Sequence, residues 1–340
     1  MKKKILVTGG AGFIGGNFVQ FMVNKYPEYE IFNLDLLTYA GDLTKHKDIE
    51  LESNYHFIKA DISDRKRITD LFEQEKFDYV VHFAAESHVD RSIINPEIFV
   101  LTNILGTQVL LDAAKANNIT KFVHVSTDEV YGELDFDPTT FFTENTPLQP
   151  NSPYSASKAS SDFMVRAYYE TFKLPVNITR CSNNYGPFHF PEKLIPLTIS
   201  RVLNNQKVPI YGNGRNIRDW LHVIDHCAAI DLVLHKGVVG EVYNVGGHNE
   251  RTNLEVVKTI INTLGKSEDL IEFVEDRLGH DKRYAIDPTK LENLGWKPTY
   301  TFETGIAQTI QWYLDNQEWW QRIISGEYQE YFEMQYSKKF

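Results

Sequence analysis

The chain has 340 residues, of which 42% are apolar and 24% charged, so it can bury one large core or two smaller ones. A formal net charge of −11 argues against a broad basic surface for nucleic acid or anionic lipid. Two cysteines cannot form a disulfide framework, and we recognise neither a signal peptide nor a run approaching the roughly 20 apolar residues of a membrane span. We therefore expect a protein of the reducing cytoplasm that binds neither membranes nor nucleic acid.

Short apolar runs alternate with helix-like stretches along the chain, which predicts a parallel sheet. Several of these runs lack polar alternation, as expected for strands that helices cover on both faces. The segment 101–116 has apolar residues at helical spacing. The predicted strands are 4–8, 30–35, 56–61, 79–84, 122–127, 175–181 and 242–246.

The pattern changes after Cys181, where turn clusters surround one clear helix over 193–203. We interpret residues 1–181 and 225–249 as one domain, and 182–224 and 250–340 as a smaller mixed α/β lobe. The chain has no linker between them that is rich in proline or serine, so the two parts should pack together. A cleft between them is the expected ligand site.

A glycine loop follows the first predicted strand and opens the first predicted helix. Gly9, Gly12 and Gly15 have the spacing and context of a dinucleotide site, where backbone N–H groups bind a pyrophosphate. Asp35 ends the next strand, where a carboxylate can bind an adenosine ribose and repel a 2′-phosphate. The loop therefore favours NAD over NADP in a Rossmann-like fold, although a glycine cluster by itself can also be a simple tight turn.

Tyr154 and Lys158 stand four residues apart at the start of a predicted helix and so share one face. A lysine beside a phenol is expected to lower the phenol pKa, which makes the tyrosine a base for alcohol oxidation. The spacing alone is common. A second motif, Ser126-Thr127-Asp128-Glu129, ends the fifth predicted strand and should face the same cleft.

Taken together, these motifs resemble the extended short-chain dehydrogenase/reductase family over nearly the whole chain. Within it, Thr127-Asp128-Glu129 and the segments 37–41, 85–92 and 276–281 are similar to the dTDP-glucose 4,6-dehydratases. The related 4-epimerases usually carry small or neutral residues at positions 128 and 129. The resemblance implies a doubly wound Rossmann-like sheet with a smaller substrate-binding lobe, NAD as cofactor, and a homodimer formed through helices 101–116 and 154–171.

The resemblance also implies a mechanism and places its residues. Tyr154, aided by Thr127, takes the proton of the sugar 4-OH while the C4 hydride passes to NAD. Glu129 then removes the C5 proton as Asp128 protonates the departing 6-OH, and hydride returns to C6. Adjacent carboxyl groups in a closed cleft drive their pKa values apart, as this requires. The product is a 4-keto-6-deoxy sugar, as in dTDP-rhamnose synthesis, and catalysis falls to Thr127, Asp128, Glu129, Tyr154 and Lys158.

The same resemblance predicts the binding residues. The cofactor contacts are Gly9, Gly12, Phe13, Ile14, Gly15, Asp35, Leu36, Leu37, Thr38, Asp61, Ile62, Phe83, Ala84, Ala85, Ser87, Thr102, Tyr154, Lys158 and Asn184. The substrate contacts are Ser87, Thr127, Asp128, Glu129, Asn183, Lys193, Leu194, Pro209, Ile210, Tyr211, Arg218, Asn253, Arg277 and His280.

Two other functions stay open at this point. One is a 4,6-dehydratase of another nucleotide sugar, such as UDP-glucose. The other is an NAD-binding regulator without catalysis, although such a protein has no need for the acid and base pair. We expect no metal site, since the histidines form no set with metal-ligand spacing and hydride chemistry requires none.

Overall fold

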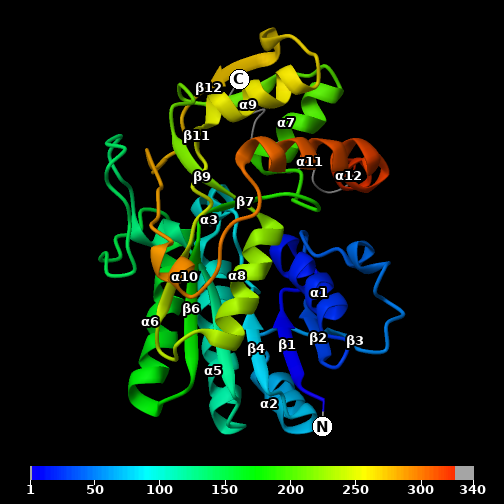
Figure 1. Cartoon of the computed structure of the whole chain (residues 1–340), viewed down its shortest axis with the longest axis vertical. Coiled ribbons are helices and arrows are strands. Elements are labelled where there is room, and N and C mark those ends of the chain that lie inside the picture. The colour runs from blue at the N-terminus through cyan, green and yellow to red at the C-terminus, as the bar shows by residue number, and fades with distance from the viewer. Residues whose placement is uncertain (1, 326–340) are drawn as a thin grey trace.

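The computed structural model describes residues 2–325, and its largest element is one parallel sheet of seven strands. The strands are β1 (Lys4–Thr8), β2 (Glu30–Asp35), β3 (Tyr55–Lys59), β4 (Tyr79–His82), β5 (Lys121–Thr127), β6 (Val176–Cys181) and β10 (Val242–Val245). Their order is β10-β6-β5-β4-β1-β2-β3, and every neighbouring pair is parallel (Figure 1). The predicted strands all form, and the doubly wound α/β fold is confirmed.

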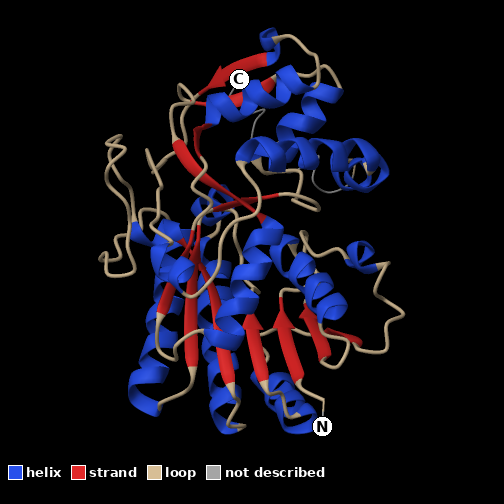
Figure 2. Cartoon of the chain, in the orientation of Figure 1, coloured by secondary structure: helices blue, strands red, loops and turns tan. Residues whose placement is uncertain are grey.

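Helices cover both faces of this sheet. Helices α1 (Phe13–Lys25) and α8 (Val223–Lys236) pack on one face, and α2 (Arg65–Glu75), α5 (Thr107–Ala116) and α6 (Pro153–Phe172) on the other (Figure 2). Successive β1 side chains enter the two cores in turn, since Ile5 and Val7 join one and Leu6 the other. All three are fully buried, which explains why the strand shows no polar alternation.

A long helical segment after β4 contains α3 (Val89–Ile94), α4 (Pro96–Phe99) and a π-helical stretch, η2 (Val100–Gly106), that runs into α5. The helix expected over 101–116 therefore forms, but its first part is a π-helix. At its end, a Cβ added to Gly106 would lie 2.6 Å from Ile62 Cδ1. The absence of a side chain thus lets the helix approach the segment that follows β3.

Residues 96–116 together are long and apolar enough to cross a membrane, with a mean hydropathy of 1.3. This corrects the expectation that no segment approaches such a length. However, half of the segment is buried inside the protein, and α5 contributes Val109, Leu110 and Leu111 to the core shared with α2 and α6. The segment is buried like a core helix, and a core helix can match a membrane span in length and composition.

A second group of elements lies beyond the carboxyl ends of the strands (Figure 2). Its strands β7 and β9 pair in parallel, β9 and β11 antiparallel, and β8 and β12 in parallel. The elements are β7 (Asn183–Tyr185), α7 (Leu194–Leu203), β8 (Val208–Tyr211), β9 (Ile217–His222), β11 (Glu250–Thr252), α9 (Asn253–Thr263), β12 (Ile271–Val274), α11 (Phe302–Asp315) and α12 (Gln317–Ile324). The remaining short helices are η1 (Leu43–His46), η3 (Asp128–Tyr131), η4 (Glu268–Leu270) and α10 (Thr289–Asn293).

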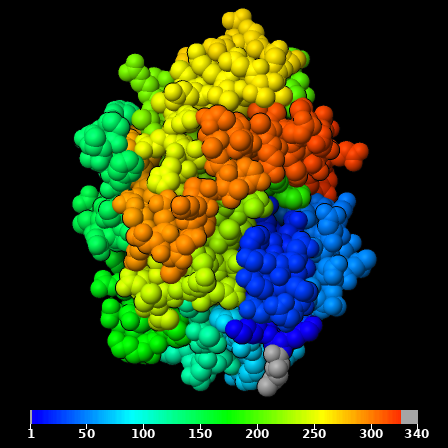
Figure 3. Space-filling model, in the orientation of Figure 1, coloured from blue at the N-terminus to red at the C-terminus, as the bar shows by residue number. Residues whose placement is uncertain are grey.

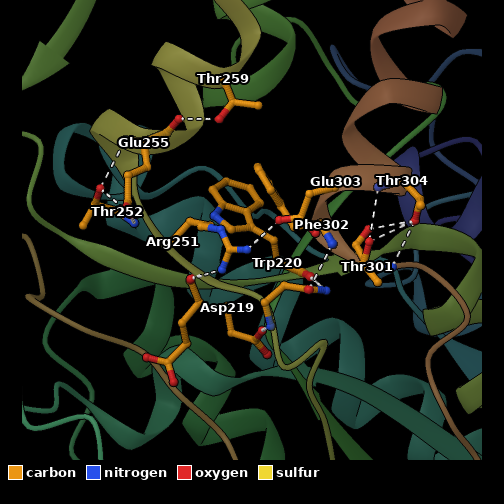
Figure 4. Close-up of polar contacts among 12 residues, drawn as sticks. Asp219, Trp220, Arg251, Thr252, Glu255, Thr259, Thr301, Phe302, Glu303 and Thr304 are labelled. Atoms are coloured by element: carbon orange, nitrogen blue, oxygen red, sulfur yellow. Dashed lines mark hydrogen bonds and ion pairs between the residues drawn. The ribbon is translucent and has the colours of Figure 1, made fainter. Parts of the chain in front are cut away.

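Helix caps and an ion pair join β11 to α9 and α11 (Figure 4). Thr252 and Glu255 form a reciprocal capping box at the start of α9, and α11 begins with a similar arrangement. Arg251 on β11 pairs with Glu303 on α11, with 2.7 Å between Nη2 and Oε1. These local contacts set the direction in which both helices leave the small sheet.

The helix α12 returns to the N-terminal part of the chain. Trp319 Nε1 and Arg322 Nη2 both donate to Asp42 Oδ2, at 2.8 and 2.7 Å, and Asp42 itself caps η1. Figure 3 shows the orange and red C-terminal helices directly above the blue N-terminal residues. Trp320 packs in the core of the C-terminal helices. The second group of elements is thus fastened to the loop that follows β2.

Candidate active site

The glycine loop between β1 and α1 forms one wall of the site. Gly9 has φ of +73°, and a Cβ there would lie 2.5 Å from Ala84 N, while a Cβ at Gly15 would overlap the Gly9 carbonyl oxygen. Gly12 precedes α1 without any side-chain cap, so the first-turn N–H groups have no side-chain acceptor there. The loop therefore offers backbone donors and the positive end of α1 to an anion.

Asp35, at the carboxyl end of β2, faces the same space. Its Oδ2 accepts a hydrogen bond from Ala11 N–H at 2.9 Å, and its Oδ1 accepts one from Leu37 N–H at 2.8 Å. Two backbone donors thus fix the carboxylate beside the glycine loop, where a dinucleotide ribose can reach it. Leu37 is a predicted cofactor contact, but it is not among the residues that line the cavity. With φ of +59°, it instead contributes its backbone N–H to Asp35.

A cavity of about 430 Å³ opens at the carboxyl ends of the parallel strands, where open α/β sheets bind their ligands. Its wall brings together most of the predicted site residues. Of the predicted cofactor contacts it contains Gly9, Gly12, Phe13, Ile14, Gly15, Asp35, Leu36, Thr38, Asp61, Ile62, Phe83, Ala84, Ala85, Ser87, Thr102, Tyr154, Lys158 and Asn184. Of the remaining substrate and catalytic residues it contains Thr127, Asp128, Glu129, Asn183, Lys193 and Leu194.

The other predicted substrate contacts do not line this cavity. Ile210 is 2% exposed and packs in a core with Val257 and Ile261, because β8 turns its side chain inward. Arg218 lies over the Tyr284 ring at 4.2 Å and donates to a backbone carbonyl, so it is held behind the wall. The set outside the wall is Pro209, Ile210, Tyr211, Arg218, Asn253, Arg277 and His280.

Some lining residues are absent from the predicted set. Many of them are sequence neighbours of predicted residues, and could have been predicted from that proximity. The segment that contains Phe190 and Glu192 has no motif with a known mechanism, so nothing in the sequence indicates it. Cys181, the last residue of β6, lines the cavity, and burial raises its thiol pKa to about 12. The unpredicted lining residues are Leu34, Tyr39, Ala40, Gly41, Ala60, Glu86, Ile98, Val125, Ser126, Cys181, Ser182, His189, Phe190, Glu192 and Trp220.

Tyr154 and Lys158 lie in the first turns of α6, which a capping box at Ser152 and a proline at the first position fix in place. Lys158 Nζ donates to Val125 O at 2.8 Å, and burial lowers the pKa of Lys158 to about 8. Burial raises the pKa of Tyr154 well above its usual value, and the nearby Glu129 carboxyl adds to the rise. The pKa of Tyr154 in the chain alone is thus shifted in the direction opposite to the expected lowering, and the loss of hydration is the largest cause.

Thr127, Asp128 and Glu129 occupy the end of β5 and the start of η3. Thr127 Oγ1 donates to Asp128 Oδ1 at 3.4 Å and accepts from Glu129 N–H at 3.3 Å. Asp128 is 2% exposed, and among the described residues its Oδ2 has no hydrogen-bond partner. Burial raises the pKa of Asp128 well above its usual value, and the Glu129 and Asp219 carboxyl groups raise it further.

Glu129 has different surroundings from its neighbour. Burial raises the pKa of Glu129 too, but three cations oppose the rise, in the order Arg277, Arg218 and Lys193. At Asp128 the opposing cation is Arg218. The pKa of both carboxyl groups is therefore raised, but more cations oppose the rise at Glu129 than at Asp128. Such a difference between neighbours suits a pair in which one carboxyl donates a proton and the other accepts one.

Fold and site together define a class, a dinucleotide-dependent enzyme of the short-chain dehydrogenase/reductase type with an added pair of carboxyl groups. In residues 2–325 no cluster of three or more His, Cys, Asp or Glu side chains could hold a metal ion.

Comparisons with known proteins agree with this class and narrow it. A family model described as GDP-mannose 4,6 dehydratase matches residues 6–309. A dTDP-glucose 4,6-dehydratase of Xanthomonas campestris pv. campestris is 53% identical, over 95% of this chain and 96% of the relative. The crystal structure of dTDP-glucose 4,6-dehydratase from Bacillus anthracis in complex with NAD has a TM-score of 0.88 and 52% identity, over 94% of this chain and 99% of that chain.

A second similar structure is that of dTDP-glucose 4,6-dehydratase from Streptomyces venezuelae with NAD and dTDP bound. It has a TM-score of 0.90 and 46% identity, over 94% of this chain and 99% of that chain. The chain therefore belongs to the nucleotide-sugar 4,6-dehydratases, and among them to the dTDP-glucose 4,6-dehydratase family.

Replacement of the Asp35 carboxylate tests the dinucleotide selectivity of the site. We expect Asp35→Ala to weaken binding of a dinucleotide with a free ribose 2′-OH roughly 10- to 100-fold, because hydrogen bonds to a charged group are lost. Binding of a dinucleotide with a 2′-phosphate should not weaken. Fluorescence titration with both dinucleotides measures the two affinities, with the exposed Glu52→Gln as control. Equal losses for both would contradict the role of Asp35.

Proposed function

We propose that this chain converts dTDP-glucose into dTDP-4-keto-6-deoxyglucose and water, with NAD as its resident cofactor. The observation that carries the proposal is the adjacent pair of the buried Asp128 and the half-buried Glu129 beside Tyr154 in one cavity. Epimerisation at C4 requires no acid and base beyond the tyrosine, whereas loss of water across C5 and C6 requires both. The similar proteins support the nucleotide and the cofactor, since they are dTDP-glucose 4,6-dehydratases and two of the structures contain NAD.

The cavity residues fit NAD. The glycine loop and the uncapped start of α1 would hold its pyrophosphate, and Asp35 would hold the adenosine ribose. Lys158, next to Tyr154 on α6, would hold the nicotinamide ribose. Bound NAD would accept the hydride from C4 of the sugar and later return it to C6, and its positive ring would favour the ionised form of Tyr154.

The protein's own groups then move protons in a fixed order. Tyr154, with Thr127 beside it, takes the proton of the sugar 4-OH as C4 becomes a ketone. The ketone acidifies the C5 proton, which the Glu129 carboxylate removes. Asp128 protonates the departing 6-OH, so water leaves across C5 and C6. The unpaired and buried Asp128 Oδ2 is suited to this role because its proton has no acceptor within residues 2–325.

A few local cations would hold the substrate diphosphate. Lys193 lines the cavity, and its Nζ donates to Ser87 O at 3.4 Å. Arg218 and Arg277 lie outside the wall, and both lower the pKa of Glu129. Since the whole chain carries a net charge of −11, binding of an anionic sugar nucleotide must depend on such local contacts.

The proposed function assigns a role to each part of the chain. Residues 1–181 and 225–249 would form the NAD-binding domain, and 182–224 and 250–340 the sugar-nucleotide lobe, of which 326–340 lie outside the described residues.

The enzyme would act in the cytoplasm in deoxysugar synthesis. Its two cysteines, Cys181 and Cys227, are both buried and unpaired, which agrees with a reducing compartment.

We also propose a homodimer through the apolar face formed by α3 to η2 and α6. Leu101 and Phe163 are 42% and 56% exposed there, and such patches mark interfaces. Sedimentation equilibrium should give twice the chain mass, and a single chain mass would contradict the dimer. The exposed apolar residues of this face are Ile93, Ile94, Ile98, Val100, Leu101, Leu105 and Phe163.

The function is tested with dTDP-glucose that carries deuterium at C4. We expect a product that has lost one water, carries the deuterium at C6, and forms without accumulation of NADH. Mass spectrometry and NMR locate the label. A product with the galactose configuration would instead show that the chain is an epimerase. Faster turnover of UDP-glucose than of dTDP-glucose would show that the substrate nucleotide is UDP.

Removal of the proposed acid separates the two halves of the reaction. We expect Asp128→Asn to slow water loss roughly 10²- to 10⁴-fold, because an amide cannot supply the proton, while C4 oxidation slows much less. In a single turnover, NADH absorbance should then rise and persist. Asp135→Asn, which replaces an exposed carboxylate on a loop, is the matched control. If oxidation and dehydration slowed equally, Asp128 would not be the acid.

A further inference from the structure

The segment that contains α3 joins the cofactor side of the cavity to the second group of elements. It directly follows Ser87, which lines the cavity. His88 Nε2 and Arg91 Nε lie 3.6 and 3.8 Å from Glu192 Oε2, just before α7. Between them in the sequence, Asp90 contacts a different part of the second group. One short helix therefore reaches two separate segments across the cavity.

Asp90 contacts two of the residues that the family resemblance assigns to the substrate. Its Oδ2 accepts the Tyr211 hydroxyl at 3.1 Å, and its Oδ1 lies 3.6 Å from Arg277 Nη1. Tyr211 ends β8, and Arg277 lies in the loop after β12, the strand that pairs with β8. Asp90 is only 5% exposed, so its end of both contacts is buried, which weakens their screening by salt.

The contact with Asp90 leaves Arg277 able to bind an anion. A separation of 3.6 Å is beyond a hydrogen bond, and the buried Arg277 Nε has no hydrogen-bond partner among the described residues. The charge of Arg277 also reaches the cavity, since it is the strongest of the cations that lower the pKa of Glu129. A guanidinium with unused donors beside the cavity suits a diphosphate.

We propose that Asp90 is a positioning residue that holds the Tyr211 hydroxyl and the Arg277 guanidinium at the cavity edge, where they bind the nucleoside diphosphate part of the substrate. This deepens the proposed function and rests on it. Asp90 itself lies outside the cavity wall, and its carboxylate contacts Tyr211 and Arg277. Its loss should therefore weaken nucleotide binding and leave the chemical steps much less affected.

The first experiment uses the NAD-loaded protein with Asp90→Asn. We expect the Kd of thymidine diphosphate, by calorimetry, and the KM of dTDP-glucose to rise about tenfold or more, because a charged partner is lost. kcat should change much less, and the amount of bound NAD should not change. Glu318→Gln, an exposed carboxylate on α12, is the control. An unchanged Kd, or a kcat loss as large as the KM change, would overturn the proposal.

A second variant, Tyr211→Phe, tests whether the Tyr211 hydroxyl must be held by Asp90 or whether the ring only stacks on a base. Its result does not depend on how well Asp90→Asn folds. It keeps the ring and removes only the hydroxyl that Asp90 accepts. A ring that merely stacks on a base would bind as before, whereas the proposal predicts a clear rise in Kd. In the double variant, Kd should rise by less than the product of the two single fold-increases, because both substitutions remove the contact between Asp90 and the Tyr211 hydroxyl. Fully multiplicative effects would contradict the proposal.

The two proposals fail in different ways. Absence of wild-type turnover with dTDP-glucose would contradict the proposed function. The calorimetric comparison needs no turnover, and it is run with thymidine and uridine diphosphate so that the identity of the base does not decide it. Weaker binding of the preferred diphosphate by Asp90→Asn would support the role of Asp90 even then.

Discussion

The chemistry proposed for this chain depends on two adjacent carboxyl groups at the end of one strand, of which Asp128 is buried and Glu129 half-buried. Burial raises the pKa of both Asp128 and Glu129, so neither would ionise readily without help. The neighbouring charges act unevenly on the two groups. Arg277, Arg218 and Lys193 all lower the pKa of Glu129. Arg218 lowers the pKa of Asp128, but two nearby carboxyl groups raise it. Such uneven surroundings suit the opposite proton-transfer roles that we propose for the two residues.

The rest of the fold can be understood as the means of holding that asymmetry. The parallel sheet brings the glycine loop, Asp35 and the β5 motif to one edge, because the carboxyl ends of its strands meet there. The second group of elements supplies the cations. It is tied to the first by Asp42 through α12 and by Asp90 through Tyr211 and Arg277. In a protein of net charge −11, the few cations that matter are those placed by such contacts.

Features with a strong local signal could be predicted from the sequence. Continuous apolar runs such as Ile5 to Val7 predict buried strands, and the glycine loop followed by Asp35 predicts a dinucleotide wall. Other features depend on tertiary contacts that no local pattern shows. The inward turn of Ile210 follows from its packing against Val257 and Ile261 of α9. The π-helical form of η2 has no recognisable local pattern either. The backbone role of Leu37, by contrast, is a local contact with Asp35 that its residue type does not indicate. The raised pKa of Tyr154 belongs here too, since spacing reveals the lysine but not the extent of burial.

The most direct test of the account is the protonation state of the two carboxyl groups at neutral pH. Infrared difference spectroscopy of the NAD-loaded protein, wild type against Asp128→Asn and Glu129→Gln, detects the carbonyl stretch of a protonated carboxyl group. The account predicts that a protonated-carboxyl band disappears in Asp128→Asn, and that an ionised-carboxylate band disappears in Glu129→Gln. Loss of only a carboxylate band in Asp128→Asn would show that Asp128 is ionised, which would contradict its role as the acid.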